Sequence, residues 1–286
     1  MIPLSNRIGF MQGRLSPMID RKIQAFPWDA WKDEFLKANN LSIRLMEWTL
    51  DQDRLYENPL MTELGRSEIN NLCTNNDILI PSLTGDCFMQ MPFWKTTEDF
   101  QDKLRKDFTA VVRSCIDLGI SILVVPLVDN GKIENIEQEN TLIEFMQSKE
   151  NFFLSHQIKI AFESDFPPDK LSRFICRLNP NAFGINYDIG NSAALGFCPE
   201  DEFNAYGERI INVHVKDRKM GGSTVALGAG DADFDKVFSG LSRLSYQGNF
   251  ILQTARAIHN EHAEVLSIYR DQTLNWLKKY VTEFKR

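Results

Sequence analysis

The chain has 286 residues, of which 43% are hydrophobic and 25% are charged, and its formal net charge is −7 at pH 7. This composition is typical of a globular protein, and an α/β barrel of such a length normally forms one domain. The acidic balance, without any run rich in lysine or arginine, argues against a nucleic-acid partner, and no segment approaches the ~20 apolar residues of a membrane span.

Eight short apolar runs, taken in chain order, predict eight β-strands. Because these runs show little alternation of polar and apolar residues, they favour a parallel sheet that is covered on both faces. The runs are RIGFM (7–11), SIRLMEW (42–48), ILIPSL (78–83), SILVVP (121–126), IKIAFE (158–163), AFGINYD (182–188), INVHV (211–215) and NFILQ (249–253).

Amphipathic segments between and after these runs predict helices. One opens near residue 97, continues to about Leu118 and ends at Gly119, because glycine commonly follows the last turn of a helix. Another begins at the prolines 167–168, and a third covers about 262–281. The alternation predicts an α/β fold, a (β/α)8 TIM barrel that forms a single domain over 1–286. A doubly wound open sheet is the alternative, but no G-x-G-x-x-G motif follows an early strand.

Polar residues lie at the ends of four consecutive strands in the second half of the chain. They are Glu163, Asp188, His214 and Gln253, and His214 is the only histidine flanked by aliphatic residues on both sides. In a TIM barrel the carboxyl ends of the strands share one rim, where function collects. Each residue also has a simpler interpretation: a helix cap for Glu163, a turn for Asp188, a core histidine for His214, and a polar strand end for Gln253.

Oxygen and nitrogen donors on adjacent strands are typical of a divalent metal site. The set lacks thiolates, which favours Mn²⁺, Mg²⁺ or Co²⁺ over a structural zinc. We therefore expect one bound divalent ion, with Mn²⁺ in first place and Mg²⁺, Co²⁺ or Zn²⁺ as alternatives.

Five motifs in barrel order extend this pattern over most of the chain. They resemble the sugar phosphate isomerase/epimerase family of xylose isomerase-like TIM barrels, which includes ketose 3-epimerases, hydroxypyruvate isomerase and inosose dehydratase. The motifs are AFES (161–164), DIGNSAALG (188–196), HVKDR (214–218), LGAGDADF (227–234) and YQGNFILQ (246–253).

The resemblance implies that Glu163, Asp188, His214 and Gln253 are the metal ligands. In the epimerases, glutamates at the first and last of these positions move protons on opposite faces of the substrate, next to a carbonyl, and the metal stabilises the enediolate. Gln253 departs from that pattern because an amide cannot act as a base. Three options stay open: a one-base isomerisation from Glu163, a second proton transfer by Lys216 or Asp86, or sugar binding without turnover.

Further rim residues are candidates for contact with the substrate. Lys216 belongs to the family's H-x-K-D pattern and is expected to take part in catalysis by neutralising an oxyanion, although a local pair with Asp217 is the simpler interpretation. Asn191 stands where several relatives carry a substrate-contacting histidine, and Arg14 is suited to an acidic group, unless it forms a structural ion pair. The substrate-binding candidates are Arg14, Glu47, Asp86, Asn191 and Arg218.

The resulting expectation is a metal-dependent sugar or sugar phosphate isomerase or epimerase. The alternatives are a keto-sugar or keto-inositol dehydratase and a non-catalytic sugar-binding barrel. A DNA-repair function is disfavoured because only one histidine is suitably placed. The five cysteines form no C-x-x-C pair and the N-terminus has no signal-peptide pattern, which favours the cytoplasm. The expected partner is a small sugar, with no nucleic acid or membrane, and a homodimer or homotetramer is compatible with the sequence.

Overall fold

The computed structural model describes residues 3–20, 22–257, 259 and 261–281. Eight parallel strands form a closed barrel in the order β1-β10-β7-β6-β5-β4-β3-β2, so the last barrel strand pairs with the first. The predicted TIM barrel is therefore confirmed, and each of the eight apolar runs supplies one strand. The strands are β1 (Ile8–Met11), β2 (Leu45–Thr49), β3 (Leu79–Thr84), β4 (Ile122–Leu127), β5 (Lys159–Ser164), β6 (Phe183–Asp188), β7 (Ile210–Val215) and β10 (Phe250–Leu252).

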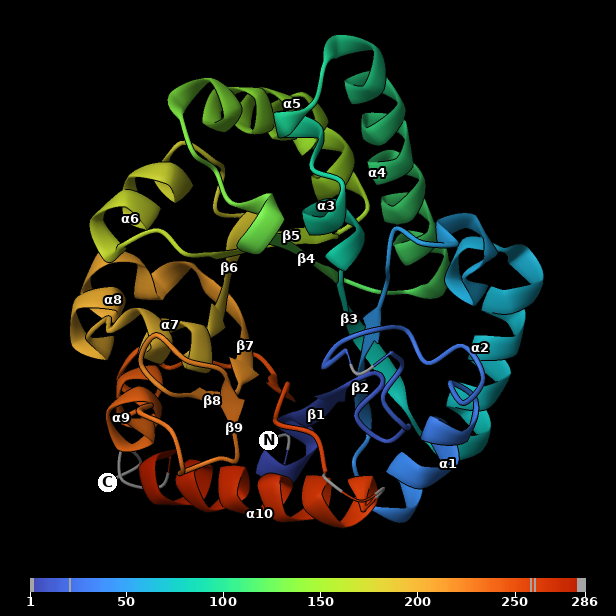
Figure 1. Ribbon diagram of the computed structural model, residues 1–286, viewed down its shortest axis with the longest axis vertical. Coiled ribbons are helices and arrows are strands. Elements are labelled where there is room, and N and C mark those ends of the chain that lie inside the picture. The colour runs from blue at the N-terminus through green and yellow to red at the C-terminus, as the bar shows by residue number, and fades with distance from the viewer. Residues whose placement is uncertain (1–2, 21, 258, 260, 282–286) are drawn as a thin grey trace.

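Helices surround the ring of strands (Figure 1). They are α1 (Asp33–Asn40), α2 (Glu63–Asn76), α3 (Asp86–Gln90), α4 (Glu98–Leu118), α5 (Ile136–Ser155), α6 (Pro168–Cys176), α7 (Ile189–Leu195), α8 (Pro199–Tyr206), α9 (Phe234–Arg243) and α10 (His262–Val281). Smaller elements occupy the loops: the antiparallel pair β8 (Asp217–Arg218) and β9 (Thr224–Val225), and the 3-10 helices η1 (Leu4–Arg7), η2 (Leu55–Glu57), η3 (Pro59–Met61), η4 (Phe93–Lys95), η5 (Asp129–Gly131) and η6 (Gly207–Arg209).

Local sequence signals determine where several helices begin and end. α4 ends at Leu118 because Gly119 adopts a left-handed conformation with φ of 85°, which glycine tolerates without strain. α6 begins at Pro168, whose fixed φ suits the first turn of a helix. The three predicted helices are thereby confirmed.

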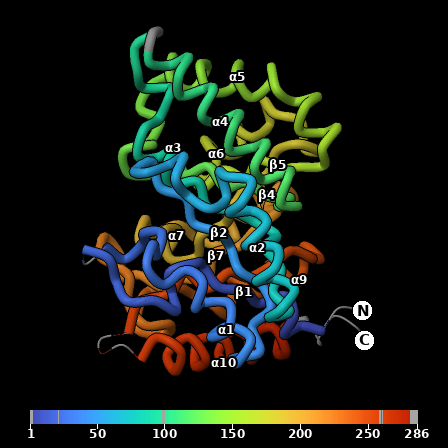
Figure 2. Tube along the Cα trace, turned by 90° about the vertical axis from the view of Figure 1, so that its right-hand side faces the viewer, coloured from blue at the N-terminus to red at the C-terminus, as the bar shows by residue number. Residues whose placement is uncertain are grey.

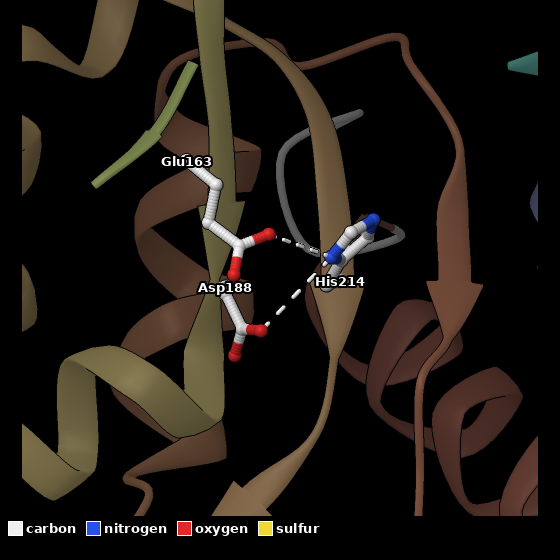
Figure 3. A group of neighbouring side chains, drawn as sticks. All are labelled: Glu163, Asp188 and His214. Carbon is white, nitrogen blue, oxygen red and sulfur yellow. Dashed lines mark ion pairs between the residues drawn. The ribbon is translucent and has the colours of Figure 1, made fainter. Parts of the chain in front are cut away.

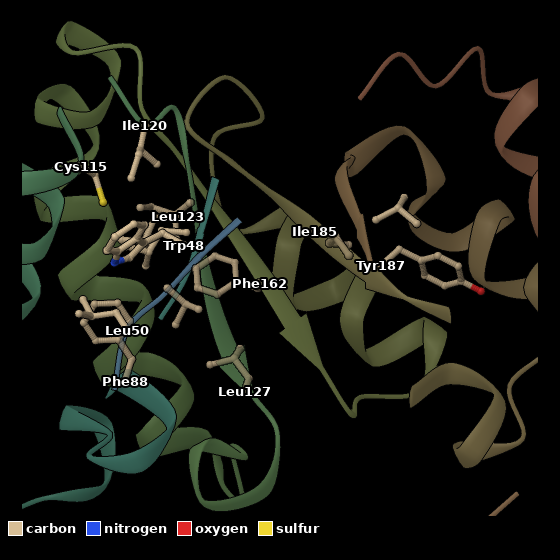
Figure 4. Packing of buried hydrophobic residues seen from close by; sticks show 14 of the residues in the cluster. Trp48, Leu50, Phe88, Cys115, Ile120, Leu123, Leu127, Phe162, Ile185 and Tyr187 are labelled. Atoms are coloured by element: carbon tan, nitrogen blue, oxygen red, sulfur yellow. The ribbon is translucent and has the colours of Figure 1, made fainter. Parts of the chain in front are cut away.

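The apolar core lies between the barrel and the helices (Figure 4). Phe162 on β5 packs edge-on against Phe174 of α6, with the ring centroids 5.2 Å apart, and it is fully buried, as is Trp48 on β2. Aromatic rings of this size supply much of the apolar area that stabilises the fold. The continuous apolar character of the strands follows from this burial.

The barrel interior contains polar side chains beneath the carboxyl rim. Glu47 on β2 is bonded to Asn212 and His214 on β7, and all three are fully buried. Strands β2 and β7 are not neighbours in the sheet, so these side chains meet inside the barrel. A polar network of this kind has to be internally satisfied, because an unpaired buried polar group is costly.

The ring of helices closes between the last helix, α10, and the first, α1. α10 lies beside α1 (Figure 2), and Arg270 of α10 donates a hydrogen bond to the carbonyl of Leu41. Among the described residues, no helix is both long and apolar enough to cross a lipid bilayer.

Candidate metal and substrate site

Three of the residues at the predicted rim converge on one point. The register pairs Asp188 of β6 with His214 of β7, and Glu163 lies near the end of the next strand, β5. His214 Nδ1 is 3.1 Å from Glu163 Oε2 and 3.9 Å from Asp188 Oδ2, and it points toward both carboxylates (Figure 3). All three side chains are buried.

Glu47 holds the far side of the imidazole. His214 Nε2 lies 2.7 Å from Glu47 Oε1, while Glu47 Oε2 accepts hydrogen bonds from Ser82 Oγ at 2.7 Å and Asn212 Nδ2 at 2.9 Å. A carboxylate is an acceptor only, so this network assigns the Nε2 hydrogen to the bond with Glu47 and orients Nδ1 toward Glu163 and Asp188. A carboxylate behind a histidine in this way is a common support of metal-binding imidazoles.

The carboxylates around His214 stabilise a positive charge on its imidazole. Burial lowers the pKa of His214, but the charges and hydrogen bonds of Glu47 and Glu163 outweigh burial and raise that pKa to about 10. Without a bound cation the imidazole is therefore protonated on both nitrogens and positively charged at neutral pH. A metal ion at Nδ1 would have to displace the proton on that atom, which couples metal binding to proton release.

The donor set fits a divalent cation. Ligand atoms from Glu163, Asp188 and His214 all lie within 4.8 Å of one another. Two ligands that are each about 2.0–2.6 Å from one ion lie at most about 5 Å apart, so the observed spacing is compatible with a shared ion. Carboxylate and imidazole donors without thiolates suit Mn²⁺, Mg²⁺, Co²⁺ or a catalytic zinc.

Gln253 is directed toward an ammonium group in this structure. Its Oε1 accepts a hydrogen bond from Lys216 Nζ at 3.3 Å, and the same Nζ donates to Asp188 Oδ2 at 3.0 Å and Asn191 Oδ1 at 2.9 Å. Lys216 thus connects Gln253 to the carboxylate cluster. Metal ligation by Gln253 stays a prediction, while the other three predicted ligands lie together.

A cavity of about 670 Å³ opens above the cluster, a volume within the range of small-molecule sites. Glu163 is the member of the cluster that lines it, and Asp188 and His214 are not among the lining residues. The predicted site residues that do line the cavity are Asp86, Glu163, Asn191, Lys216, Arg218 and Gln253.

Comparison with known families gives this arrangement a context. The sequence model of the xylose isomerase-like TIM barrel family matches residues 35–280. The chain belongs to this family. The resemblance inferred from the five motifs is therefore confirmed.

The sequence relatives of this chain include sugar phosphate epimerases. The L-ribulose-5-phosphate 3-epimerase UlaE of Shigella flexneri serotype 5b is 24% identical over 267 residues, which cover 87% of this chain and 89% of that protein. UlaE of Escherichia coli strain SMS-3-5 is 25% identical over 263 residues, with the same coverage of each chain.

Solved structures show the same barrel along nearly the whole chain. A zinc-bound IOLI protein superposes with a TM-score of 0.74 at 17% identity, covering 96% of this chain and 99% of that one. D-psicose 3-epimerase from Clostridium cellulolyticum H10, solved with D-tagatose, gives 0.71 at 11% identity, with the same coverage. At these identities the likeness concerns the fold.

Two predicted substrate contacts lie away from the cavity. Glu47 is fully buried and both of its oxygens are bonded, so it supports His214 from inside the barrel. Arg14 is also buried, and its guanidinium donates to the carbonyls of Thr254 and Ile23 and to Gln24 Oε1. Burial lowers the pKa of Arg14 to about 9. Arg14 ties the loop after β1 to the end of β10, and neither residue is among those that line the cavity, so substrate contact by Glu47 and Arg14 stays a prediction.

Two asparagines that the sequence reading did not single out belong to the network. Asn186 Nδ2 donates to Glu163 Oε2 at 2.8 Å and lies 3.0 Å from His214 Nδ1, and Asn212 Nδ2 donates to Asn186 Oδ1 at 2.9 Å. Each lies two residues before a predicted ligand and between apolar side chains, in INYD on β6 and IINVHV on β7. An amide in the middle of a buried strand needs partners, and that is the signal that could have revealed them.

Asp217 organises the loop that follows β8 and β9. Its carboxylate accepts hydrogen bonds from the backbone amides of Gly228 and Gly230, each at 2.8 Å, and from Ala232 at 3.2 Å. A Cβ at Gly230 would lie 1.9 Å from Asp217 Oδ1, so this position requires glycine. Asp217 therefore anchors the loop and makes no ion pair with Lys216 in the described residues.

Proposed function

We propose that the protein is a sugar isomerase or epimerase that transfers a proton at the carbon next to a carbonyl, and that it uses a divalent cation held by Glu163, Asp188 and His214, with Mn²⁺ as the first candidate. The observation that carries this proposal is the convergence of two buried carboxylates and the Nδ1 atom of His214 below a cavity of ligand size. Family membership and the epimerase relatives support it.

When bound, the cation would polarise the substrate carbonyl and offset the negative charge that develops during proton removal. Glu163 is the residue of the cluster that lines the cavity, and we assign it the role of base. Asn191 donates to its Oε1 at 2.7 Å and Asn186 to its Oε2 at 2.8 Å. These bonds hold the carboxylate in one orientation, which a base needs for efficient proton transfer.

Lys216 would stabilise negative charge on the substrate oxygen from the same floor of the cavity. Its ammonium is fixed by three acceptors and does not have to reorganise during the reaction, which is the condition under which electrostatic stabilisation is effective. Gln253 cannot return a proton on the second face. The proposed reaction therefore proceeds from one base, as in an aldose–ketose isomerisation.

A binding-only barrel is the second candidate, and the bond between Gln253 and Lys216 favours it, because a neutral amide stands where the epimerases have a base. Solvent deuterium exchange into keto-sugars separates the two functions. We expect exchange that is lost after treatment with EDTA and restored by Mn²⁺, and a Glu163→Gln variant with activity lower by 10²–10⁴-fold.

The matched control is Glu144→Gln, which changes an exposed carboxylate on α5. It should exchange deuterium like the wild type. If chelated wild-type protein retains full exchange, the metal-dependent function is wrong. If Mn²⁺-loaded protein binds keto-sugars without any exchange, the binding-only barrel is supported instead.

A further inference from the structure

Arg218 lines the cavity and, within the described residues, donates hydrogen bonds only to neutral oxygen atoms. Its Nε and Nη2 donate to the carbonyl of Gly222 at 3.1 and 2.7 Å, and its Nη1 donates to Asn191 Oδ1 at 2.8 Å. A guanidinium is well suited to pair with a carboxylate or a phosphate. Its direction toward a side-chain amide therefore indicates that it orients this amide.

The hairpin formed by β8 and β9 holds the guanidinium in place. The two strands are antiparallel, and Gly222, which accepts two of the guanidinium bonds, lies in the turn between them. Asp217, the residue before Arg218, accepts hydrogen bonds from the backbone amides of Gly228 and Gly230 at 2.8 Å each. This anchor does not involve the guanidinium, so the hairpin should stay in place when the side chain of Arg218 is shortened or replaced.

The amide of Asn191 is oriented by two cations. Its Oδ1 accepts hydrogen bonds from Lys216 Nζ at 2.9 Å and from Arg218 Nη1 at 2.8 Å. Its Nδ2 donates to Glu163 Oε1 at 2.7 Å. In the reversed orientation the amide would place its N–H groups against both cations and its oxygen against the carboxylate of Glu163. The two cations therefore determine which end of this buried amide faces Glu163.

These cations differ in what else they bind. Lys216 shares its three hydrogens among three side chains, whereas Asn191 is the only side chain that Arg218 binds in the described part of the chain. The guanidinium is planar and is fixed by two bonds to the turn of the hairpin, so it presents an N–H to Asn191 in a set direction. The contacts of Arg218 thus converge on the orientation of one amide.

We propose that Arg218 is a positioning residue, which acts through the amide of Asn191 to hold the carboxylate of Glu163 in the orientation required for proton transfer. This inference rests on the proposed function, in which Glu163 is the base. It gives Arg218 a role that differs from the substrate contact expected from the sequence, because the guanidinium acts on a protein amide and not on the sugar. Removal of a group that orients a metal ligand typically lowers activity by about 10–100-fold.

The first test is the variant Arg218→Met, which removes the guanidinium and keeps a long unbranched side chain. At saturating Mn²⁺, kcat for deuterium exchange into a keto-sugar should fall about tenfold, while KM changes by less than about twofold. Loss of a direct contact with the substrate would instead raise KM and leave kcat unchanged. The matched control is Lys219→Met on the same hairpin, where the exposed lysine lies 3.6 Å from Asp231, and it should keep the wild-type kcat and KM.

A double-mutant cycle tests whether Arg218 acts through Asn191. Asn191→Ala should lower kcat by itself, since Glu163 Oε1 loses the hydrogen bond from Nδ2. Addition of Arg218→Met to Asn191→Ala should lower kcat no further, because the amide through which the guanidinium acts is already absent. An equal loss of kcat in the two backgrounds would overturn the inference.

A measurement that does not depend on turnover follows the side-chain amide of Asn191 by NMR. Protein labelled with ¹⁵N would be studied with Mg²⁺, which is diamagnetic, in place of Mn²⁺, and the signal of this amide is the one missing from Asn191→Ala. The bond to Glu163 should protect the Nδ2 protons against exchange with solvent. Their exchange should be about tenfold faster in Arg218→Met and unchanged in Lys219→Met.

Two results would overturn the inference and leave the proposed function intact. One is a rate of solvent exchange at the Asn191 amide that is the same in Arg218→Met and in the wild type. The other is a rise in KM of Arg218→Met with kcat unchanged, which would make Arg218 a substrate contact. Absence of deuterium exchange between the wild type and every keto-sugar would overturn the proposed function, and the NMR measurement would still decide whether Arg218 orients Asn191.

Discussion

The two sides of the cavity are built differently. On the side of β6 and β7, the charged groups Lys216 and Arg218 are held by hydrogen bonds to Asp188, Asn191 and a backbone carbonyl. On the side formed by the loops after β3, β4 and β5, Asp86, Asp129 and Asp165 line the cavity as an acidic wall, and they form no ion pair within the part of the chain that the structure describes. On one side the charged groups are already held by hydrogen bonds, and on the other side the carboxyl groups are free to bond to a ligand.

This difference indicates a division of labour. Groups that act on developing charge are effective when they are already oriented, and the bonded side meets that condition. Groups that recognise hydroxyl groups can exchange bound water for substrate when no other protein group occupies them, and the acidic wall meets this second condition. The reacting carbon would therefore lie over Glu163 and Lys216, with the rest of the sugar extending toward Asp129 and Asp165.

The largest expected effect is on the free energy of unfolding, and it comes from removing His214, which lies beneath the side of the cavity formed by β6 and β7. His214→Ala would leave the fully buried carboxylate of Glu47 without its imidazole partner. Removal of one member of a buried charged pair typically costs about 3–5 kcal/mol. We expect urea unfolding to show a loss of that order, whereas His156→Ala, at an exposed position, should change the free energy of unfolding little.

A second substitution tests the cause of that loss. Glu47→Gln in the His214→Ala background removes the uncompensated charge, so the double variant should be more stable than the single His214→Ala variant. Equal stability of these two variants would show that the loss reflects a packing defect and not the buried carboxylate.

The next effect concerns Asp86 on the acidic wall. Burial, followed by the charges of Asp51 and Glu163, raises the pKa of Asp86 to about 8, although His214 lowers it. A carboxyl whose pKa is higher in the folded protein than in the unfolded chain contributes stability below its unfolded pKa and loses that contribution as pH rises to its folded pKa. The protein should therefore lose up to about 1.4 kcal/mol per pH unit from this group between about pH 4 and 8.

Asp86→Asn should remove this part of the pH dependence. The free energy of unfolding of the variant relative to wild type should increase as pH rises from 4 to 8 and stay constant above pH 8. Urea titrations at several pH values measure the difference. A difference that does not vary with pH would mean that Asp86 keeps an ordinary pKa in the folded protein.

The sequence predicted the strands of the barrel better than it predicted which side chains point into the barrel interior and which line the cavity. Apolar runs located each strand, because a parallel sheet buried on both faces leaves that pattern. Glu163 and Glu47 both lie near strand ends, but Glu47 points into the barrel interior while Glu163 lines the cavity. Which of these occurs depends on partners far away in the chain, and for Glu47 the partner His214 is 167 residues away.

The predicted ligand set shows the same limit. Glu163, Asp188 and His214 converge because strand order alone brings their strands side by side. The direction of Gln253 depends on a side-chain contact with Lys216 that no strand pattern encodes. Arg14 follows β1, the position expected of a residue at the rim. Its guanidinium nevertheless bonds to the backbone carbonyls of Ile23 and Thr254 and so stabilises the loop.

The smallest expected effect is a change in Mn²⁺ affinity in Lys216→Met, which tests the side of the cavity where Lys216 and Arg218 are held by hydrogen bonds. Methionine keeps a long unbranched side chain but removes the ammonium that binds Asp188 at 3.0 Å. The carboxylate of Asp188 would then keep only its bond from the backbone amide of Asn191 and no competing ammonium, so Mn²⁺ should bind about tenfold more tightly, a gain of about 1.4 kcal/mol. Deuterium exchange should fall at the same time, because the group proposed to stabilise the substrate oxygen is lost. Calorimetry with Mn²⁺ and exchange kinetics provide the two measurements, and Lys219→Met, at an exposed lysine 3.6 Å from Asp231, is the matched control.

If Mn²⁺ binds no more tightly to Lys216→Met than to the control, the ammonium does not compete with the cation for Asp188, and the two sides of the cavity differ less in electrostatics than their hydrogen bonds indicate.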